Sequence, residues 1–244
     1  MQLTDRVVLV TGGAQRLGRA IAHSLAQRQA DVVITYRSSG QAARDTVSLL
    51  RRCGVRAEAI RADVSKAADV RRLMRRIAAQ FGRLDVLVNN AAVFVRTPFA
   101  TLTERDWDAH LDANLKGPFL CALHASRLMR AHGAGKIINI ADWASERPYR
   151  DYLPYCISKA GVIALTKALA KELAPKIQVL AIAPGPMLPP PGMSARERAR
   201  VIKQVPLKRW GAPEDIARAV CFLIEGTDFM TGTTLYVDGG RLIA

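Results

Sequence analysis

Short apolar runs rich in β-branched residues alternate with amphipathic helical patterns along almost the whole chain. We expect strands at 7–10, 32–35, 57–60, 86–88, 136–140, 178–182 and 234–237. Helices are expected at about 15–28, 40–53, 66–81, 104–131, 153–173 and 213–224. Continuously apolar strands separated by helices are typical of a parallel sheet that is covered on both faces. With right-handed crossovers, this pattern predicts an α/β fold, a single-domain Rossmann-like doubly wound sheet of about seven strands.

One segment does not follow this alternation. Residues 184–205 contain five prolines and then a charged helical stretch at 194–203. Because sheet elements are expected on both sides of it, the segment is not a linker between domains. We interpret 184–205 as a mobile substrate flap, and the 244 residues as one domain, 1–244.

The charge of the chain leaves three interpretations open. Its net charge is +15, from 36 basic and 21 acidic residues. The excess fits a solvated surface with arginine spread over the helices, or the attraction of anionic small molecules. Binding of nucleic acid is the least favoured interpretation, because no basic stretch carries the interleaved aromatic residues that would stack on bases.

Cysteine usage and hydropathy bear on the compartment. The four cysteines are scattered without a C-x-x-C pair, which argues against a zinc site or a disulfide framework and indicates a reducing cytoplasm. No apolar run approaches the roughly 20 residues that span a membrane. The first residues enter a strand pattern without the apolar region of a signal peptide. We therefore expect a cytoplasmic protein with no membrane partner and no metal.

A glycine-rich turn follows the first expected strand. Residues 11–18, with the sequence TGGAQRLG, lead from this strand into the first helix. Glycines allow close approach of the backbone, and a helix N-terminus presents free N–H groups to a pyrophosphate. This order of strand, turn and helix predicts a dinucleotide site. The alternative is a simple strand-to-helix turn.

The end of the second strand favours NADP(H) over NAD(H). An enzyme specific for NAD usually has an acidic residue here, which binds the ribose 2′-hydroxyl. This chain has Tyr36, Arg37 and Ser38 instead, and a guanidinium beside hydroxyl groups suits a 2′-phosphate. Arg16 supplies a second cation nearby. We expect NADPH as the cofactor. The alternative is that Arg37 is only a loop residue.

Tyr155 and Lys159 are four positions apart and so share one face of a helix. A lysine ammonium beside a phenol favours the phenolate and lowers the pKa of the phenol, which then exchanges a proton near neutral pH. Asp142 precedes Tyr155 by thirteen residues. Unless it is protonated, its charge would repel the negative charge that develops on a carbonyl oxygen during reduction. Ordinary carbonyl reduction is therefore a poorer fit to this sequence.

From Val7 to about Gly240 the chain resembles the short-chain dehydrogenase/reductase family. This resemblance implies hydride transfer with a nicotinamide cofactor. It implies that Asp63 and Val64 border the adenine, and that Asn89 lies on the adenosine ribose side. It also implies that Asn114 holds a water of the proton relay, and that Lys159 contacts the nicotinamide ribose. The other cofactor-binding residues that we expect are Gly12, Arg16, Leu17, Ala91, Tyr155, Pro184 and Gly185.

Two residues depart from the common family pattern. Arg16 stands where most members have glycine, and Asp142 stands where most have serine. Both are similar to the pteridine reductase branch, as is Phe94, which would form a stacking wall for a flat pterin. This resemblance implies that Arg16 lies near the cofactor phosphate and the pterin. The expected function is NADPH-dependent reduction of a dihydropterin or dihydrofolate to the tetrahydro form, with the proton passing through Tyr155 and Asp142.

Several alternatives stay open. The enzyme could be a carbonyl reductase acting on 3-oxoacyl thioesters, or the chain could be a non-catalytic NADP(H) sensor. Phe94 could be a core or interface aromatic, and Asn114 could only cap or kink its helix. Ser145 could replace Asp142, although it lies ten rather than thirteen residues before Tyr155. Five further residues are candidates for the lining of the substrate pocket: Trp143, Tyr149, Tyr152, Met187 and Trp210. Family resemblance also implies a homotetramer, assembled through the helices at 104–131 and 153–173.

Overall fold

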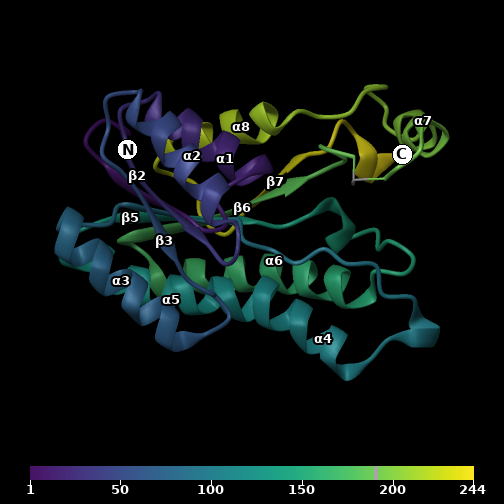
Figure 1. The fold of residues 1–244 in the computed structure, drawn as a ribbon, viewed down its shortest axis with the longest axis horizontal. Helices are drawn as coiled ribbons and strands as arrows, with labels where there is room; N and C mark the ends of the chain where they lie inside the picture. The colour runs from purple at the N-terminus through teal and green to yellow at the C-terminus, as the bar shows by residue number, and fades with distance from the viewer. Residues whose placement is uncertain (190–191) are drawn as a thin grey trace.

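The computed structural model of the chain describes residues 1–189 and 192–244, and it contains a single sheet of seven parallel strands. The order of the strands across the sheet is β3-β2-β1-β4-β5-β6-β7. Their bounds are β1 Val7–Val10, β2 Asp31–Tyr36, β3 Ala57–Arg61, β4 Val86–Asn89, β5 Gly135–Ile140, β6 Ile177–Pro184 and β7 Thr234–Val237. The doubly wound fold that the alternating pattern predicts is confirmed (Figure 1).

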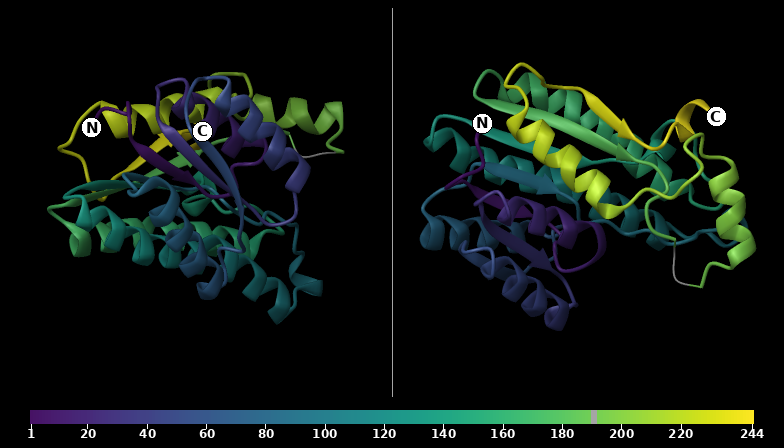
Figure 2. Two further views of the ribbon diagram at one scale, coloured as in Figure 1. Left: turned by 60° about the vertical axis from the view of Figure 1, so that its left-hand side comes forward. Right: turned by 90° about the horizontal axis from the view of Figure 1, so that it is seen from above.

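Helices cover both faces of the sheet. One face carries α1 Arg16–Ala26, α2 Gly40–Arg51 and α8 Pro213–Glu225, and the other carries α3 Ala67–Phe81, α4 Glu104–Leu111, α5 Gly117–Ala131 and α6 Leu153–Leu173 (Figures 1 and 2). The remaining helix, α7 Ala195–Lys203, lies at one end of the molecule, beyond the carboxyl ends of the strands (Figure 2). Short 3₁₀ turns lie at η1 Phe99–Thr101, η3 Trp143–Ser145 and η4 Arg241–Ile243.

The strand order reverses between β1 and β4, which both pair with their neighbours in parallel register. In an open parallel sheet, this point of reversal leaves a crevice at the carboxyl ends of the strands. The turn after β1 and the loop after β4 both end at this crevice. The fold therefore brings the glycine-rich turn and the predicted catalytic residues to one edge of the sheet.

The expected helix at 104–131 is interrupted. A π-helical segment, η2 Asp112–Lys116, separates α4 from α5. Asn114 lies in this segment, where its side chain bonds to the backbone of Val93 and to Ser158 rather than pointing to solvent. The periodicity of apolar residues does not change at such a bulge, which is why the sequence predicted one continuous helix.

The proposed flap contains an ordered helix. Pro184 ends β6, and α7 begins after Ser194, whose hydroxyl accepts a hydrogen bond from the amide of Glu197 in a capping box. Residues 190 and 191 of the flap lie outside the described residues. The mobility of this segment and its role in binding substrate stay predictions.

Helix α6 corrects the statement that no segment is apolar enough to span a membrane. Its 21 residues pass that test by length and composition. In the structure α6 packs against β6 and η2, and its buried residues include Tyr155 and Lys159. The helix therefore has the packing of a core helix. Residues 1–189 and 192–244 hold no group of three or more His, Cys, Asp or Glu side chains that could bind a metal ion.

Candidate active site

The turn after β1 is held against the end of β4. The hydroxyl of Thr11 accepts hydrogen bonds from the amides of Asn90 and Ala91, each at 3.0 Å, and the Asn90 side chain donates to the Thr11 carbonyl at 2.9 Å. Gly12 has φ +64°, and a Cβ there would lie 2.9 Å from the Cα of Ala91. Only glycine fits at this approach. Asn90, which the sequence analysis did not single out, fixes the geometry of the turn.

The N-terminus of α1 is suited to an anion. Gln15 precedes the helix but makes no side-chain cap hydrogen bond, since its amide group donates to Ser39 Oγ at 2.7 Å. The first N–H groups of α1 are therefore free of a side-chain acceptor, and they carry the positive end of the helix dipole. Leu17 is half-buried on the first turn. The free N–H groups of α1 and the backbone of Gly12, which no side chain covers, fit the pyrophosphate of a dinucleotide.

A polar cavity of about 600 Å³ opens beside the ends of β2 and β3. Tyr36, Arg37, Arg61 and Asp63 line it together with residues of α3. Ser38 is exposed on the adjoining loop, and Val64 is buried behind it. A cavity of this size and charge, at the end of the second strand, fits the adenosine end of a phosphorylated dinucleotide.

Asn89 does not face the open crevice. It is buried, and its side-chain amide donates to Asn139 Oδ1 at 2.9 Å and to the Pro118 carbonyl at 3.4 Å. Asn139 in turn donates to Thr166 Oγ1 at 2.9 Å, so that these amides join β4, β5 and α6. Contact of Asn89 with a cofactor stays a prediction, and the role that its bonds show is to hold the strand ends in register.

Asn114 joins three elements. Its Oδ1 accepts from the amide of Val93 at 2.7 Å, and its Nδ2 donates to the Val93 carbonyl at 2.9 Å and to Ser158 Oγ at 3.0 Å. It is buried and contacts α6 through Ser158. These bonds hold the loop after β4, which carries Phe94, against the helix of Tyr155. The sequence placed Asn114 at the site but did not predict this positioning role.

Asp142 and Tyr155 are in direct contact. The phenol of Tyr155 donates to Asp142 Oδ2 at 2.7 Å. Asp142 Oδ1 accepts from the amide of Ala144 at 2.8 Å and from the phenol of Tyr149 at 3.5 Å. Ser145, the alternative to Asp142, has a buried hydroxyl without a partner among the described residues. The pairing that the thirteen-residue spacing suggested is therefore the one that the fold forms.

Burial decides the electrostatics of this pair. The Asp142 carboxyl lies deep among protein atoms, although part of its surface remains accessible, and desolvation raises its pKa against the opposing effect of its hydrogen bonds. Desolvation and the adjacent Asp142 raise the pKa of Tyr155 well above its usual value. The expectation of a lowered tyrosine pKa is wrong, because burial outweighs the lysine. Tyr155 therefore keeps its proton until a stronger base faces it.

Lys159 is the third ionisable group of the site. Its ammonium donates to the Ile140 carbonyl at 2.7 Å and lies 5.9 Å from the centroid of the Tyr155 ring. The side chain is 4% exposed. Burial lowers its pKa to about 8, and attraction to Asp142 opposes that shift. Lys159 is therefore a cation that a small change in its surroundings can neutralise.

An aromatic cluster surrounds the phenol of Tyr155. Phe94 stacks on Tyr152, with ring centroids 4.6 Å apart and planes 10° apart, and meets Tyr155 edge-on at 4.7 Å. Phe94 remains 46% exposed. Trp143 donates from Nε1 to the Tyr149 phenol at 2.5 Å. Because Tyr152 already covers one face of Phe94, a flat ligand has only the other face of that ring to stack on.

The remaining predicted residues are spread around this centre. Arg16 is exposed at the start of α1 and has φ +51°, a left-handed conformation. Pro184 and Gly185 lie where β6 meets β7, and a Cβ on Gly185 would lie 2.4 Å from the Cα of Asp238. Met187 is half-buried beside Gly211, and the indole N–H of Trp210 is buried without a partner among the described residues.

Comparison with known proteins gives matches along almost the entire chain. The family model described as enoyl-(acyl carrier protein) reductase matches residues 12–241. The 3-oxoacyl-[acyl-carrier-protein] reductase of Synechocystis sp. is 39% identical over an alignment of 247 positions that covers 99% of this chain and 98% of that protein. The enzyme FabG of Staphylococcus epidermidis, which has the same name, is 36% identical over 240 residues, 97% of this chain and 98% of its own.

Solved structures give the same result for the fold. A variant of the actinorhodin polyketide ketoreductase, solved with NADPH, has a TM-score of 0.92 and 31% identity, and the match covers 100% of this chain and 99% of the other. An NAD⁺-bound xylitol dehydrogenase has a TM-score of 0.91 and 29% identity, with 98% and 100% covered. Similar chains therefore hold either cofactor.

These relatives overturn the expected function. Similarity along the full length to 3-oxoacyl-[acyl-carrier-protein] reductases contradicts the interpretation as a pterin or folate reductase and favours the carbonyl reductase alternative. In the sequence, Asp142 counted against a carbonyl substrate only in its ionised form. Its burial raises its pKa, and a neutral carboxyl can donate a hydrogen bond as a serine hydroxyl does. The aspartate is therefore no argument against a carbonyl substrate.

Proposed function

The chain belongs to the short-chain dehydrogenase/reductase family, and from this premise we propose that it is an NADPH-dependent carbonyl reductase whose substrates are 3-oxoacyl thioesters. It is an oxidoreductase. The observation that carries the choice of a carbonyl substrate is the buried contact between Asp142 and Tyr155, at 2.7 Å. This contact brings a carboxyl and a phenol together at one point of the crevice.

Asp142 acts in this proposal as a neutral acid. Desolvation raises its pKa, so the carboxyl carries a proton to a higher pH than a solvated aspartate does. Its hydrogen bond then supports the carbonyl oxygen, on which negative charge develops during reduction. The bond from the Ala144 amide to Oδ1, at 2.8 Å, fixes the orientation of the carboxyl.

Tyr155 supplies the proton. Its raised pKa keeps the phenol protonated until the substrate oxygen has become the stronger base. The proton then passes to that oxygen, which becomes the hydroxyl of the product, and the Lys159 ammonium stabilises the phenolate that is left. Asn114 positions the loop of Phe94 and α6 relative to each other. When bound, NADPH supplies the hydride that reduces the carbonyl carbon.

The cofactor is NADPH. The absence of an acidic residue after β2 and the cationic cavity beside Arg37 support this assignment, as does the NADPH held by a similar ketoreductase. We assign the pyrophosphate to Gly12, Arg16 and Leu17. The adenosine end is assigned to Tyr36, Arg37, Ser38, Asp63, Val64 and Ala91, and the nicotinamide end to Tyr155, Lys159, Pro184 and Gly185.

The test follows NADPH oxidation by its near-ultraviolet absorbance, with acetoacetyl-CoA as the substrate. Asp142→Ala should reduce kcat by about 10²–10³ because it removes one donor to the developing oxyanion. Asp142→Ser, which restores a donor, should keep kcat within about tenfold of the original enzyme. Wild-type activity should fall as pH rises through the raised pKa of Asp142, since the neutral form is present only below that pKa. Asp142→Ser should lack this fall.

Three other outcomes would contradict parts of this proposal. Turnover of dihydrobiopterin without turnover of acetoacetyl-CoA would contradict the choice of substrate class. NADPH binding without turnover of any carbonyl substrate would favour the sensor alternative. If Asp142→Ser were as inactive as Asp142→Ala, the carboxyl would have a role that a second hydroxyl cannot take, and the neutral-acid mechanism would be wrong.

We also propose a homotetramer in the cytoplasm. Apolar side chains on α5 and α6 remain exposed in the single chain, among them Phe119 at 43% and Ile157 at 47%. A face of two long helices with such residues is suited to burial against a second copy. The four free cysteines fit a reducing compartment. Light scattering during gel filtration measures the assembly, and Phe119→Glu should dissociate it to smaller species.

A further inference from the structure

The cavity at the ends of β2 and β3 has an excess of positive charge. Arginine and lysine side chains make up five of the residues that line it, against two aspartates, Asp63 and Asp69. The five are Arg37, Arg61, Lys66, Arg72 and Arg76. A cavity with this balance attracts an anion. The question is which of these cations are free to bind one.

Two of the five are already neutralised. Arg72 pairs with Asp69 at 2.9 Å, and the Arg76 guanidinium pairs with Glu58 at 2.5 Å. For Arg37, Arg61 and Lys66 the described residues contain no ion-pair partner within 4.0 Å. The positive charge that remains available is therefore concentrated on the β2 and β3 side of the cavity.

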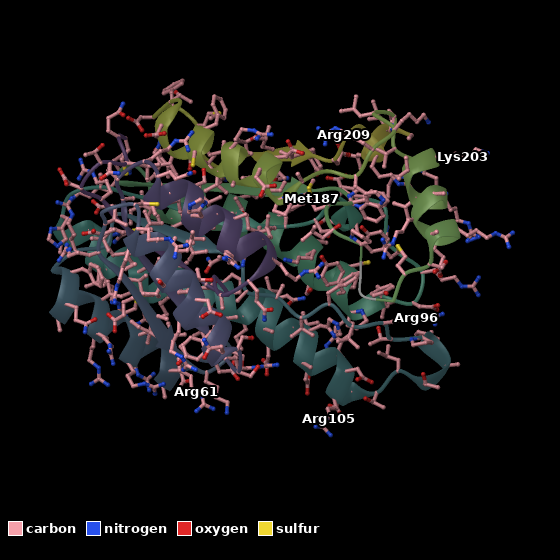
Figure 3. The ribbon with its side chains drawn as sticks, turned by 45° about the horizontal axis from the view of Figure 1, so that its top comes forward. Arg61, Arg96, Arg105, Met187, Lys203 and Arg209 are labelled. Atoms are coloured by element: carbon pink, nitrogen blue, oxygen red, sulfur yellow. The ribbon has the colours of Figure 1, made fainter. Side chains whose placement is uncertain are left out.

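The backbone of Arg37, the residue predicted to contact the 2′-phosphate, orients Arg61. Arg61 ends β3 and pairs in register with Tyr36, the last residue of β2. Its Nε donates to the backbone carbonyl of Arg37 at 3.2 Å. The bond holds the Arg61 guanidinium against the backbone of Arg37 and leaves both terminal amino groups available as donors. Figure 3 shows Arg61 at the rim of the molecule, where a ligand can reach it.

Two guanidinium groups that line one cavity repel each other unless an anion lies between them. A phosphate monoester is nearly dianionic at neutral pH and accepts paired hydrogen bonds from the planar fork of arginine. NADPH carries such a group on its adenosine ribose, and NADH carries a hydroxyl there. The distinction between the two cofactors therefore falls on the part of the cavity between Arg37 and Arg61.

We infer that Arg61 and Arg37 together form a two-arginine clamp for the 2′-phosphate of NADPH, in which Arg61 is a specificity-determining residue that the Arg37 carbonyl orients. This inference rests on the proposed function only for the identity of the cofactor. It places part of the discrimination on β3, whereas the sequence pattern assigned it to the residues at the end of β2, with Arg16 as a second cation.

The experiment measures dissociation constants of NADPH and NADH by isothermal titration calorimetry, without substrate. Arg61→Ala should weaken NADPH about ten- to hundredfold and change NADH by less than about twofold, because charge-assisted bonds to phosphate are lost only in the first case. Arg61→Lys should give an intermediate loss for NADPH, since an ammonium keeps the charge but not the fork. Circular dichroism checks that each variant is folded.

The matched control is Arg76→Ala, which removes an arginine from the same cavity that is already paired with Glu58. It should change NADPH binding by less than about twofold. Titration with 2′,5′-ADP and with inorganic phosphate separates the nucleotide phosphate from any small anion: Arg61→Ala should weaken the first by the same factor as NADPH. Equal binding of inorganic phosphate and 2′,5′-ADP to the wild type would contradict the clamp.

Two failures are distinguishable. If the wild type binds NADPH and NADH equally, the cofactor assignment in the proposed function is wrong. If it prefers NADPH but Arg61→Ala leaves that preference unchanged, or weakens both cofactors equally, only the clamp is wrong.

Discussion

Two buried lysines mark the two ends of β5, and the protein uses them in opposite ways. Lys136 lies near the start of the strand, and Lys159 bonds to the carbonyl of Ile140, where the strand ends. They are 1% and 4% exposed. The difference between them lies in the number of partners that each ammonium has.

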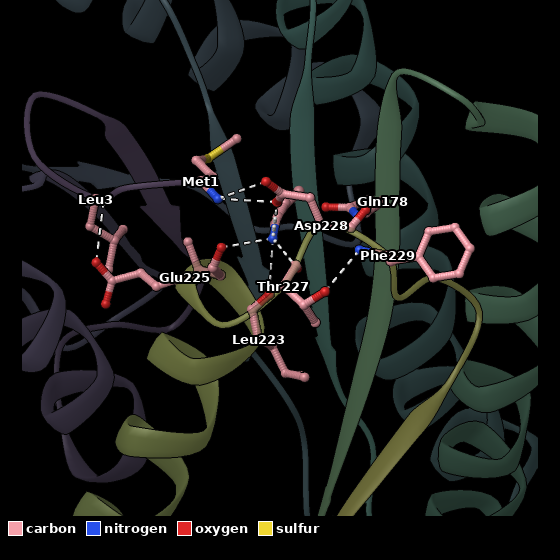
Figure 4. Close-up of polar contacts among 10 residues, drawn as sticks. Met1, Leu3, Gln178, Leu223, Glu225, Thr227, Asp228 and Phe229 are labelled. Carbon is pink, nitrogen blue, oxygen red and sulfur yellow. Dashed lines mark hydrogen bonds and ion pairs between the residues drawn. The ribbon is translucent and has the colours of Figure 1, made fainter.

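Lys136 has a complete set of acceptors. Its ammonium donates to the carbonyls of Leu223, Ile224 and Thr227 at 3.2, 2.7 and 3.0 Å, and it pairs with Asp228 at 2.8 Å. Asp228 also accepts from the amino group of Met1 at 3.0 Å. Figure 4 shows these groups converging where α8 ends. The lysine satisfies carbonyls that the last turn of a helix leaves without N–H partners.

Lys159 has one carbonyl and a lowered pKa, about 8. Its desolvation is only partly compensated, by the Ile140 carbonyl and Asp142, so its charge is held at a cost in stability. The comparison teaches that the amino-terminal edge of the sheet uses buried charge to hold the chain together. The carboxyl-terminal edge keeps its buried charge incompletely satisfied and therefore available for chemistry.

The largest effect should come from Lys136→Met. The substitution leaves the three carbonyls at the end of α8 without their donor and removes the partner of Asp228. We expect the free energy of unfolding to fall by about 3–5 kcal/mol, measured by urea denaturation. Lys167→Met on the exposed side of α6 is the control and should change it by less than about 0.5 kcal/mol. A loss below about 1 kcal/mol would mean that water replaces the ammonium, and the contrast with Lys159 would not hold.

Lys159→Met should act in the opposite direction on stability. The lowered pKa indicates that the buried charge costs roughly 3 kcal/mol of stability at pH 7, and the substitution removes this cost. It also leaves the Ile140 carbonyl without a donor, which lowers stability by about 1–2 kcal/mol. We therefore expect a gain of about 1–2 kcal/mol in the free energy of unfolding, with a loss of most NADPH oxidation activity. Destabilisation by more than about 1 kcal/mol would show that Lys159 is as well satisfied as Lys136.

A pH series sharpens this result. The folded chain releases the Lys159 proton near pH 8 and the unfolded chain near pH 10.5, so the unfolded state binds more protons between these values. Stability of the wild type relative to Lys159→Met should therefore rise with pH across that window. A difference that is flat with pH would contradict the lowered pKa.

The sequence predicted the fold closely because periodicity reports burial. Strands β1 and β7 and helix α6 have the predicted bounds, and the other strands differ by one or two residues at an end. The π-helical η2 was missed, because it depends on the bonds of Asn114 to Val93 and Ser158, which are distant in the sequence. The role of Lys136 was also missed. A lysine in an apolar strand is the signal that could have indicated it.

At the site, the sequence predicted which residues meet but not their charge states. The spacing of Asp142 and Tyr155 was enough to pair them. Their protonation depends on desolvation, which is a property of the packed fold, and the wrong substrate class was reached with the raised pKa of Asp142 left out. Arg61 was not considered, because its relation to Arg37 arises only from the pairing of β2 with β3.

The smallest effect should come from Arg16→Gly, which tests whether the left-handed backbone of Arg16 at the carboxyl-terminal edge is retained for the cofactor. Arg16 has φ +51°, in the left-handed region that costs a side-chain-bearing residue about 1–2 kcal/mol. Glycine removes that cost and loses about 0.5–1 kcal/mol in chain entropy, so we expect a net gain near 0.5–1 kcal/mol. NADPH should bind about two- to tenfold more weakly, because a cation is lost beside the pyrophosphate.

Lys208 provides the matched control. It also has φ +51°, but its ammonium bonds to the carbonyl of Lys203 in the flap, away from the glycine-rich turn. Lys208→Gly should give a similar gain in the free energy of unfolding without any change in NADPH affinity. If both variants gain stability and only Arg16→Gly loses affinity, the strain at Arg16 is retained for the cofactor. If neither affinity changes, Arg16 has no part in binding, and the strain at this edge has no functional cause.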